Sequence, residues 1–188
     1  MKLFDTFKKL LSEAKGNTYD YGCVMVYFDI DEDWWGERQS EIKDEDIYHG
    51  TKEDPGYGRE DEPHVTILYG LHSDIPDETI EELVKKMTAP EVTLKEIGMF
   101  DNANRGFDVV KFDVEGQDLH DMNTMFAKLP HTTDYPDYHP HSTLAYVKAG
   151  TGKKYCGSLD DDKVLTLRPN KVVYSKADGS KKEYKFSS

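Results

Sequence analysis

The sequence predicts an α+β fold in which mostly antiparallel strands carry two helices on their outer faces. Three observations support this prediction. Short stretches rich in β-branched and aromatic residues recur along the chain and have the length of strands. Two other stretches place their apolar residues at helical spacing, and turn signals such as Asp178-Gly179 separate neighbouring strands. At 188 residues, the chain can form one domain, or two closely packed lobes, with a substantial core.

The N-terminal residues 1–15 are expected to form a short amphipathic helix with apolar positions at Leu3, Phe4, Phe7, Leu10 and Leu11. Lys and Asp interrupt its apolar run, so we do not interpret it as a signal peptide, and no later stretch is long enough to span a membrane. Docking of this helix onto the protein is favoured over binding to a membrane surface. The two cysteines, Cys23 and Cys156, provide no disulfide framework. We therefore expect a soluble, cytoplasmic protein with free thiols.

A buried strand at residues 23–30 leads into a long polar segment at residues 31–62. Residues 29–62 hold fourteen acidic and four basic side chains, so most of the net charge of −13 lies there. This charge argues against a nucleic-acid duplex as partner, but a small anion held by a few contacts is feasible. Trp34 and Trp35 are expected either to cap a ligand site or to anchor the segment. The start of a calcium loop at residues 29–33 is not completed, because Trp34 and Ser40 replace its required Gly and Glu.

The remaining elements follow in order. A helix is expected to start at residues 74–77 and to bury Ile80, Leu83, Val84 and Met87. Residues 91–100 and 107–115 alternate as the two strands of a hairpin. A second helix is expected from about residue 117 to 129, and its buried face would hold Leu119, Met122, Phe126 and Leu129. The tail, residues 164–186, is expected to form two strands that turn at Asp178-Gly179.

Two copies of one short signature dominate the chain. They are His64-Val65-Thr66-Ile67 and His141-Ser142-Thr143-Leu144, and each follows a proline and occupies a predicted strand, at residues 65–71 and 142–147. Residues two apart on a strand share a face, so the His and Thr of each copy project together. Histidine exchanges protons near neutral pH, and a threonine hydroxyl is a neutral donor. Two such pairs that face each other would supply an acid, a base and two donors for phosphoryl chemistry without a metal.

These motifs, in this order of strands and helices, resemble the 2H phosphoesterase superfamily, which includes RNA 2′,3′-cyclic phosphodiesterases of the LigT type. The resemblance extends over nearly the whole chain, from the strand at 23–30 to the terminal strand pair. It implies a single domain of two pseudo-symmetric lobes, in which antiparallel sheets form a central cleft and helices lie outside. The long acidic insertion at about residues 31–62 departs from compact members. The run EPHVTILYG at residues 62–70 resembles a phage group, the anti-CBASS phosphodiesterases that hydrolyse cyclic oligonucleotide signals of bacterial immunity.

By match to the family motif, His64 and His141 would be the catalytic pair, and Thr66 and Thr143 their hydroxyl partners. The expected activity is metal-independent cleavage of phosphodiester bonds in small cyclic or linear oligonucleotides, without a cofactor, in the host cytoplasm if the protein is viral. Which histidine is the base stays open. Nucleobases bind aromatic rings by stacking, so the candidate contacts are aromatic residues near the motifs, with core packing as the alternative for each. They are Tyr19, Tyr21, Phe100, Phe107, Tyr138 and Tyr146.

Three other interpretations of these residues compete with this one. Processing of RNA ends that carry 2′,3′-cyclic phosphates would use the same chemistry, but the acidic composition favours a smaller ligand. A module that sequesters a nucleotide without turnover would have no need of two histidines with matching hydroxyls. The pair His139 and His141 could begin a metal site, but no pattern in the sequence completes it.

Overall fold

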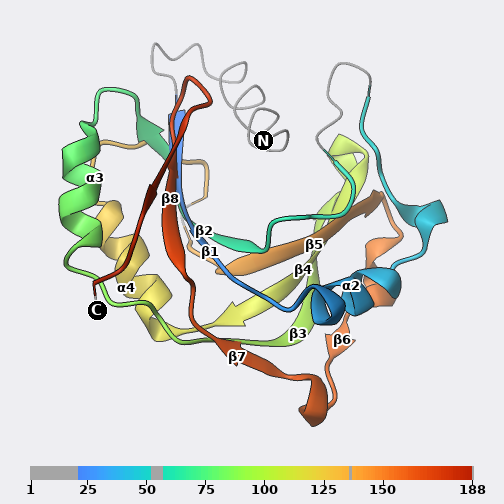
Figure 1. Cartoon of the computed structure of the whole chain (residues 1–188). Helices are drawn as coiled ribbons and strands as arrows, with labels where there is room; N and C mark the ends of the chain where they lie inside the picture. The colour runs from blue at the N-terminus through green and yellow to red at the C-terminus, as the bar shows by residue number, and fades with distance from the viewer. Residues whose placement is uncertain (1–20, 52–56, 136, 188) are drawn as a thin grey trace.

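The computed structural model describes residues 21–51, 57–135 and 137–187. The expected N-terminal helix and Tyr19 lie outside the described residues. Within them the chain forms two antiparallel sheets with a few short helices, as Figure 1 shows. The predicted α+β class is therefore confirmed.

The first sheet, called sheet A, has the strand order β2-β1-β8-β9. Its strands are β1 (Tyr21–Tyr27), β2 (His64–His72), β8 (Lys171–Ser175) and β9 (Lys181–Tyr184). The strands β8 and β9 form the hairpin expected at the tail, and Gly179 adopts a φ of 86° in its turn. Strand β2, which begins with the first signature, lies at one edge of this sheet.

The second sheet, called sheet B, has the strand order β5-β4-β3-β6, and β7 pairs with another part of β3. Its strands are β3 (Val92–Asn102), β4 (Phe107–Glu115), β5 (His141–Lys148), β6 (Gly157–Ser158) and β7 (Leu165–Leu167). The tail thus contains three strands, not two, and its first strand joins sheet B. Pro169 follows β7 and has no N–H to continue a ladder, so the chain can leave sheet B there and enter sheet A.

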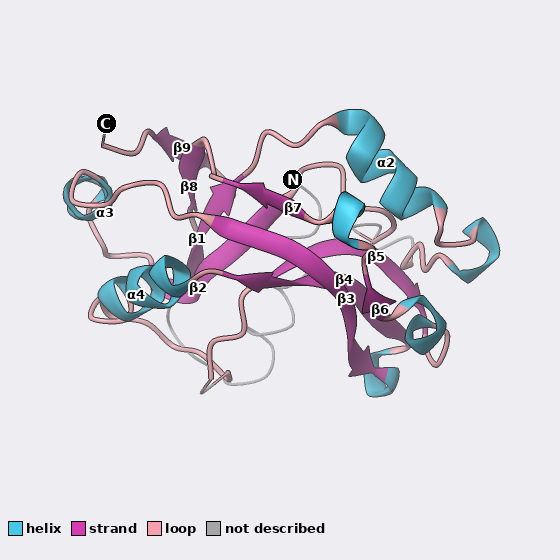
Figure 2. Ribbon diagram, turned by 90° about the horizontal axis from the view of Figure 1, so that it is seen from below, coloured by secondary structure: helices cyan, strands magenta, loops and turns pink. Residues whose placement is uncertain are grey.

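In the described part of the chain, three α-helices pack on these sheets: α2 (Glu32–Ser40), α3 (Asp77–Val84) and α4 (Gln117–Phe126). Figure 2 shows α3 and α4 together at the sheet A end of the molecule and α2 at the opposite end. Helix α4 is tied to β2 by the Asn123 side chain, which donates a hydrogen bond to the Ile67 carbonyl at 2.7 Å. The helix predicted to start at residues 74–77 and the helix predicted at about residues 117–129 are present as α3 and α4.

Helix α2 was not predicted from the sequence, and its start explains the acidic run that resembles a calcium loop. The Asp31 side chain caps the helix by accepting a hydrogen bond from the Trp34 N–H at 2.9 Å, and Glu32 and Asp33 occupy the first turn. Trp35 is buried, and the Trp34 ring stacks on Phe112 with centroids 5.7 Å apart. The two tryptophans therefore anchor the acidic segment to the body of the protein.

The main core is one continuous cluster that draws on both sheets and all three helices. In β2 it contains Val65 and Ile67, both fully buried, which alternate with the His and Thr of the first signature. In β5 it contains Leu144, the residue that follows the second signature threonine. The His and Thr side chains of both copies therefore face away from the main core, on the other side of each sheet.

Candidate active site

The two signatures meet because their strands lie at the facing edges of the two sheets. Strand β2 is an edge of sheet A, strand β5 is an edge of sheet B, and the two strands contact each other. His64 begins β2 and His141 begins β5. The two imidazoles are close enough for a charge on His64 to lower the pKa of His141. The fold thus brings the two histidines into one site.

Each histidine makes the same kind of hydrogen bond, from its ring to the backbone carbonyl two residues before it. Nδ1 of His64 lies 2.7 Å from the Glu62 carbonyl oxygen, and Nδ1 of His141 lies 2.8 Å from the His139 carbonyl oxygen. A carbonyl oxygen can only accept, so Nδ1 carries the hydrogen in both rings. Nε2 is then the atom that accepts or donates a proton in each histidine. The matched setting leaves both rings in the same tautomer, with Nε2 free of hydrogen in the neutral form.

An aromatic ring supports each histidine. The Tyr27 ring stacks on His64 with centroids 5.2 Å apart, and the Phe100 ring meets His141 edge-on at 4.8 Å. Tyr27 lies directly opposite His64 in the β1–β2 ladder. Tyr27 is a site residue that the sequence analysis missed, because its position depends on the register of two strands that are far apart in the chain.

A lysine lies beyond each of these rings. Lys181 Nζ lies 3.3 Å from the Tyr27 hydroxyl and 3.4 Å from a Glu62 carboxylate oxygen. Lys111 Nζ lies 4.7 Å from the centre of the Phe100 ring and forms an ion pair with Asp113. Neither lysine was identified from the sequence, since no local pattern marks a basic residue as part of a site.

The two histidines differ in electrostatic environment. Burial lowers the pKa of His141 from 6.5 to about 4; the bond to the His139 carbonyl opposes this, and the charges of Lys111 and His64 add to it. Loss of water disfavours the charged form of an imidazole, which is why burial has this sign. His141 is therefore neutral at neutral pH, with the Nε2 lone pair available.

The two threonines are also held by hydrogen bonds. The Thr66 side chain bonds the Cys23 thiol, and burial raises the pKa of that thiol to about 12. The Thr143 side chain bonds the Tyr146 hydroxyl, and burial raises the pKa of that hydroxyl well above its usual value. The alternation of each strand places each hydroxyl on the same face as its histidine.

The predicted base-binding aromatics are spread over different environments. Tyr21 is buried and pairs with His72, at the far end of β1 from His64. The Tyr138 hydroxyl donates to the Thr66 carbonyl at 3.1 Å, which places this ring beside the first signature. Phe107 and Tyr146 are buried, whereas Phe100 is partly exposed.

Phe107 and Tyr146 belong to an aromatic cluster with Tyr48 and Tyr57, two partly exposed residues of the acidic segment. The Tyr57 ring lies 4.9 Å from Phe107 and 5.2 Å from Tyr146, between centroids, so it forms the outer layer. Tyr48 and Tyr57 were not predicted from the sequence, because no local pattern in the acidic segment indicates that their rings pack against sheet B.

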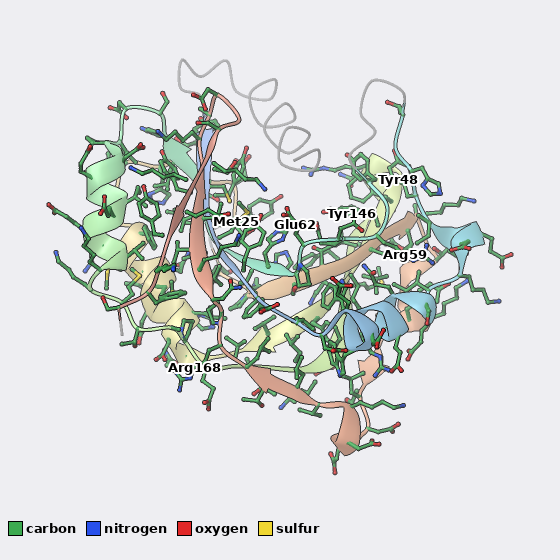
Figure 3. The ribbon with its side chains drawn as sticks, in the orientation of Figure 1. Met25, Tyr48, Arg59, Glu62, Tyr146 and Arg168 are labelled. Atoms are coloured by element: carbon green, nitrogen blue, oxygen red, sulfur yellow. The ribbon has the colours of Figure 1, made fainter. Side chains whose placement is uncertain are left out.

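The acidic segment reaches this position by pairing with the free edge of β5. Tyr48 N–H donates to the Tyr146 carbonyl at 2.9 Å, and Tyr146 N–H donates to the Gly58 carbonyl at 2.8 Å. An unpaired strand edge is a site of unwanted pairing, and this segment covers it. Figure 3 shows Tyr48 beside Tyr146, and Glu62 between Tyr146 of sheet B and Met25 of sheet A.

The protein donors do not gather as metal ligands do. In residues 21–51, 57–135 and 137–187 there is no group of three or more His, Cys, Asp or Glu side chains that could hold a metal ion. His139 is exposed and contributes its backbone carbonyl to the site. No helix in this part of the chain is long and apolar enough to cross a membrane.

Comparisons with known proteins agree with this architecture. The model of the 2′-5′ RNA ligase superfamily matches residues 30–177. Among solved structures, Usb1 from Kluyveromyces marxianus is similar at 8% identity and a TM-score of 0.56, covering 89% of this chain and 99% of that one. E. coli LigT complexed with 3′-AMP is similar at 11% identity and a TM-score of 0.52, covering 90% and 96%. No curated protein sequence matches. At these identities the solved structures share the fold.

Proposed function

The chain belongs to the 2′-5′ RNA ligase superfamily, the 2H phosphoesterases, and from this membership we propose that it is a metal-independent phosphodiesterase. Its substrates would be small cyclic or linear oligonucleotides. The observation that carries the proposal is the matched setting of His64 and His141, with Nδ1 of each bonded to a backbone carbonyl and Nε2 left for proton transfer. Two such groups in one site can serve as a base and an acid in the same reaction.

The reaction would proceed by in-line displacement at phosphorus. A neighbouring 2′-hydroxyl, or a water molecule when the substrate is a cyclic phosphate, attacks after losing its proton to a base. His141, neutral at neutral pH, fits this role, and His64 is then the acid that protonates the departing oxygen. Thr66 and Thr143 would donate hydrogen bonds to the non-bridging oxygens as negative charge develops on them.

Three observations support a small nucleotide as substrate. Usb1 has been solved with uridine monophosphate and LigT with 3′-AMP, and both share this fold. The aromatic cluster beside the second signature offers rings for a base to stack on. The net charge of −13 disfavours a long polyanion. Immune signals built as cyclic oligonucleotides fall within this class, and their cleavage would be a viral counter-defence of the anti-CBASS type.

The proposal is tested by incubating the protein with cyclic di- and trinucleotides, 2′–5′ oligoadenylates and an RNA that ends in a 2′,3′-cyclic phosphate. EDTA is present, and the products are read by mass spectrometry. We expect cleavage of a small oligonucleotide that survives EDTA and is lost in His64→Ala. If only the RNA end is cleaved, the substrate is an RNA 2′,3′-cyclic phosphate and not a small oligonucleotide. If a ligand is bound but stays intact, the protein sequesters it and does not catalyse its cleavage.

The pH dependence of kcat/KM distinguishes the two possible roles of His141. If His141 is the base, the rate rises with pH through a pKa of about 4, because only the neutral imidazole accepts a proton. The rise that reports His141 should therefore be nearly complete by pH 6. If His141 were the acid, kcat/KM would fall as pH rises above about 4. The profile is measured from pH 3.5 to 8, with circular dichroism at each pH to confirm that the protein is folded.

A further inference from the structure

We propose that Lys111 supplies the positive charge that binds and neutralises the reacting phosphate, as a further catalytic residue beside the two signatures. The inference rests on the proposed function, since it assumes that a phosphate reacts between His64 and His141. It concerns a side chain outside both His-x-Thr motifs.

The register of sheet B puts Lys111 on the signature face. Lys111 lies directly opposite Thr143 in the β4–β5 ladder, and Asp113 lies directly opposite His141. Residues that face each other across an antiparallel pair project to the same side, with Cβ atoms about 5 Å apart. An ion pair between Lys111 and Asp113 therefore runs alongside the second signature.

Several contacts hold the Lys111 ammonium in place. The side chain is 6% exposed, whereas that of its partner Asp113 is 48% exposed. Nζ also lies 4.7 Å from the centre of the Phe100 ring, and this ring touches the His141 imidazole edge-on. The ammonium is thus fixed between a carboxylate and a ring that contacts His141.

Strand β3 leaves room for this ion pair at Gly98, which faces Lys111 in the β3–β4 ladder. A Cβ added to Gly98 would lie 2.5 Å from Oδ2 of Asp113 and 3.0 Å from Nζ of Lys111. Any side chain at this position would displace the pair. The backbone is therefore shaped around the ammonium and the carboxylate.

Lys111 would supply a permanent positive charge beside the second signature. Negative charge grows on the non-bridging oxygens during attack at phosphorus, and the threonine hydroxyls are neutral donors. The histidines exchange protons and do not remain cationic through the reaction. An ammonium has three N–H donors, so pairing with Asp113 leaves donors for phosphate oxygens. Lys111 also acts on the site electrostatically, because its charge contributes to the lowered pKa of His141.

A purely structural role explains the pair less well. Asp113 is 48% exposed, and an ion pair that is open to water on one side contributes little to the stability of a fold. The two roles also predict different behaviour. If the pair is structural, stability falls by a similar amount when either partner is replaced. If Lys111 binds phosphate, binding is lost when Lys111 is replaced and strengthened when Asp113, which partly neutralises its charge, is replaced.

The test compares Lys111→Met, Lys111→Arg and Asp113→Asn with the matched control Lys95→Met. Lys95 of β3 forms an exposed ion pair with Glu115 of β4, at 2.6 Å, with 46% of its side chain exposed. Turnover of the substrate found above, binding of 3′-AMP by calorimetry and thermal unfolding are measured for each. We expect Lys111→Met to lower kcat/KM by about 10²- to 10³-fold, as loss of one charge-stabilising donor does.

The pattern across the variants decides the outcome. We expect Lys111→Arg to keep part of the activity, Asp113→Asn to bind 3′-AMP more tightly than wild type, and Lys95→Met to match wild type. Parallel losses of melting temperature and activity in Lys111→Met and Asp113→Asn would overturn the inference in favour of a structural pair. Full turnover by Lys111→Met would also overturn it while leaving the proposed function intact. If the wild-type protein neither cleaves a substrate nor binds 3′-AMP, both the proposed function and the role of Lys111 are wrong.

Discussion

Replacing His141 with alanine is expected to lower turnover by about 10²- to 10⁴-fold, the contribution of one proton-transfer group. His64→Ala should have an effect of the same size, because the proposed mechanism uses Nε2 of each ring for one of its two proton transfers. Once the first is lost, removal of the second should cost less, since groups that act as a unit are not additive. Thr66→Ala and Thr143→Ala should cost less than either histidine variant, because each removes one neutral donor.

The measurement is kcat with purified protein on the cleaved oligonucleotide, together with the melting temperature of each variant. His49→Ala serves as the control, because His49 is exposed and belongs to neither signature. Wild-type turnover in either His64→Ala or His141→Ala would disprove the two-histidine mechanism. A loss of activity that follows the melting temperature across all variants would point to unfolding instead.

The sequence predicts the elements of this fold well where the signal is local. Alternating apolar residues identify both signature strands, and Asp178-Gly179 identifies the final hairpin, in which Gly179 takes the positive φ that its turn needs. Helix α2 was missed although Asp31, Glu32 and Asp33 form a helix start. The packing of this helix on the protein depends on the contact between Trp34 and Phe112, two residues that are far apart in the sequence. Local signals therefore determine the elements, and remote contacts decide whether weak ones form.

The candidate site follows the same division. The His and Thr of each signature share a face because side chains alternate along a strand with a period of two, and this rule needs only the sequence. Lys111 and Tyr27 join the site only through cross-strand register. Strand β5 also contains an irregularity, since Val110 pairs with Ala145 and Lys111 pairs with Thr143. One residue of β5 is therefore unpaired, a bulge that shifts the following side chains and cannot be placed from composition.

Gly70→Ala is expected to be the most destabilising single substitution in the first signature strand, by at least about 3 kcal/mol. Gly70 lies in β2 with a φ of 97°, a conformation that side chains other than glycine rarely adopt. An added Cβ would also lie 1.8 Å from the carbonyl oxygen of Thr132, a backbone atom that cannot rotate away. The loop that leads to His141 is joined to β2 at this point, since Thr132 N–H donates to the Gly70 carbonyl at 2.9 Å.

Gly106→Ala separates the two causes of this loss. Gly106 has a similar φ of 86°, but no atom lies within 4 Å of an added Cβ, so only backbone strain of about 1–3 kcal/mol applies. Urea unfolding at 25 °C gives the free energy of both variants, and turnover is measured per folded molecule. Because Gly70 connects the strand of the first signature to the loop before the second, Gly70→Ala should also lose activity beyond its loss of folded protein. Equal destabilisation by the two variants, with normal turnover per folded molecule, would mean that the Gly70–Thr132 contact does not hold the two histidines in register.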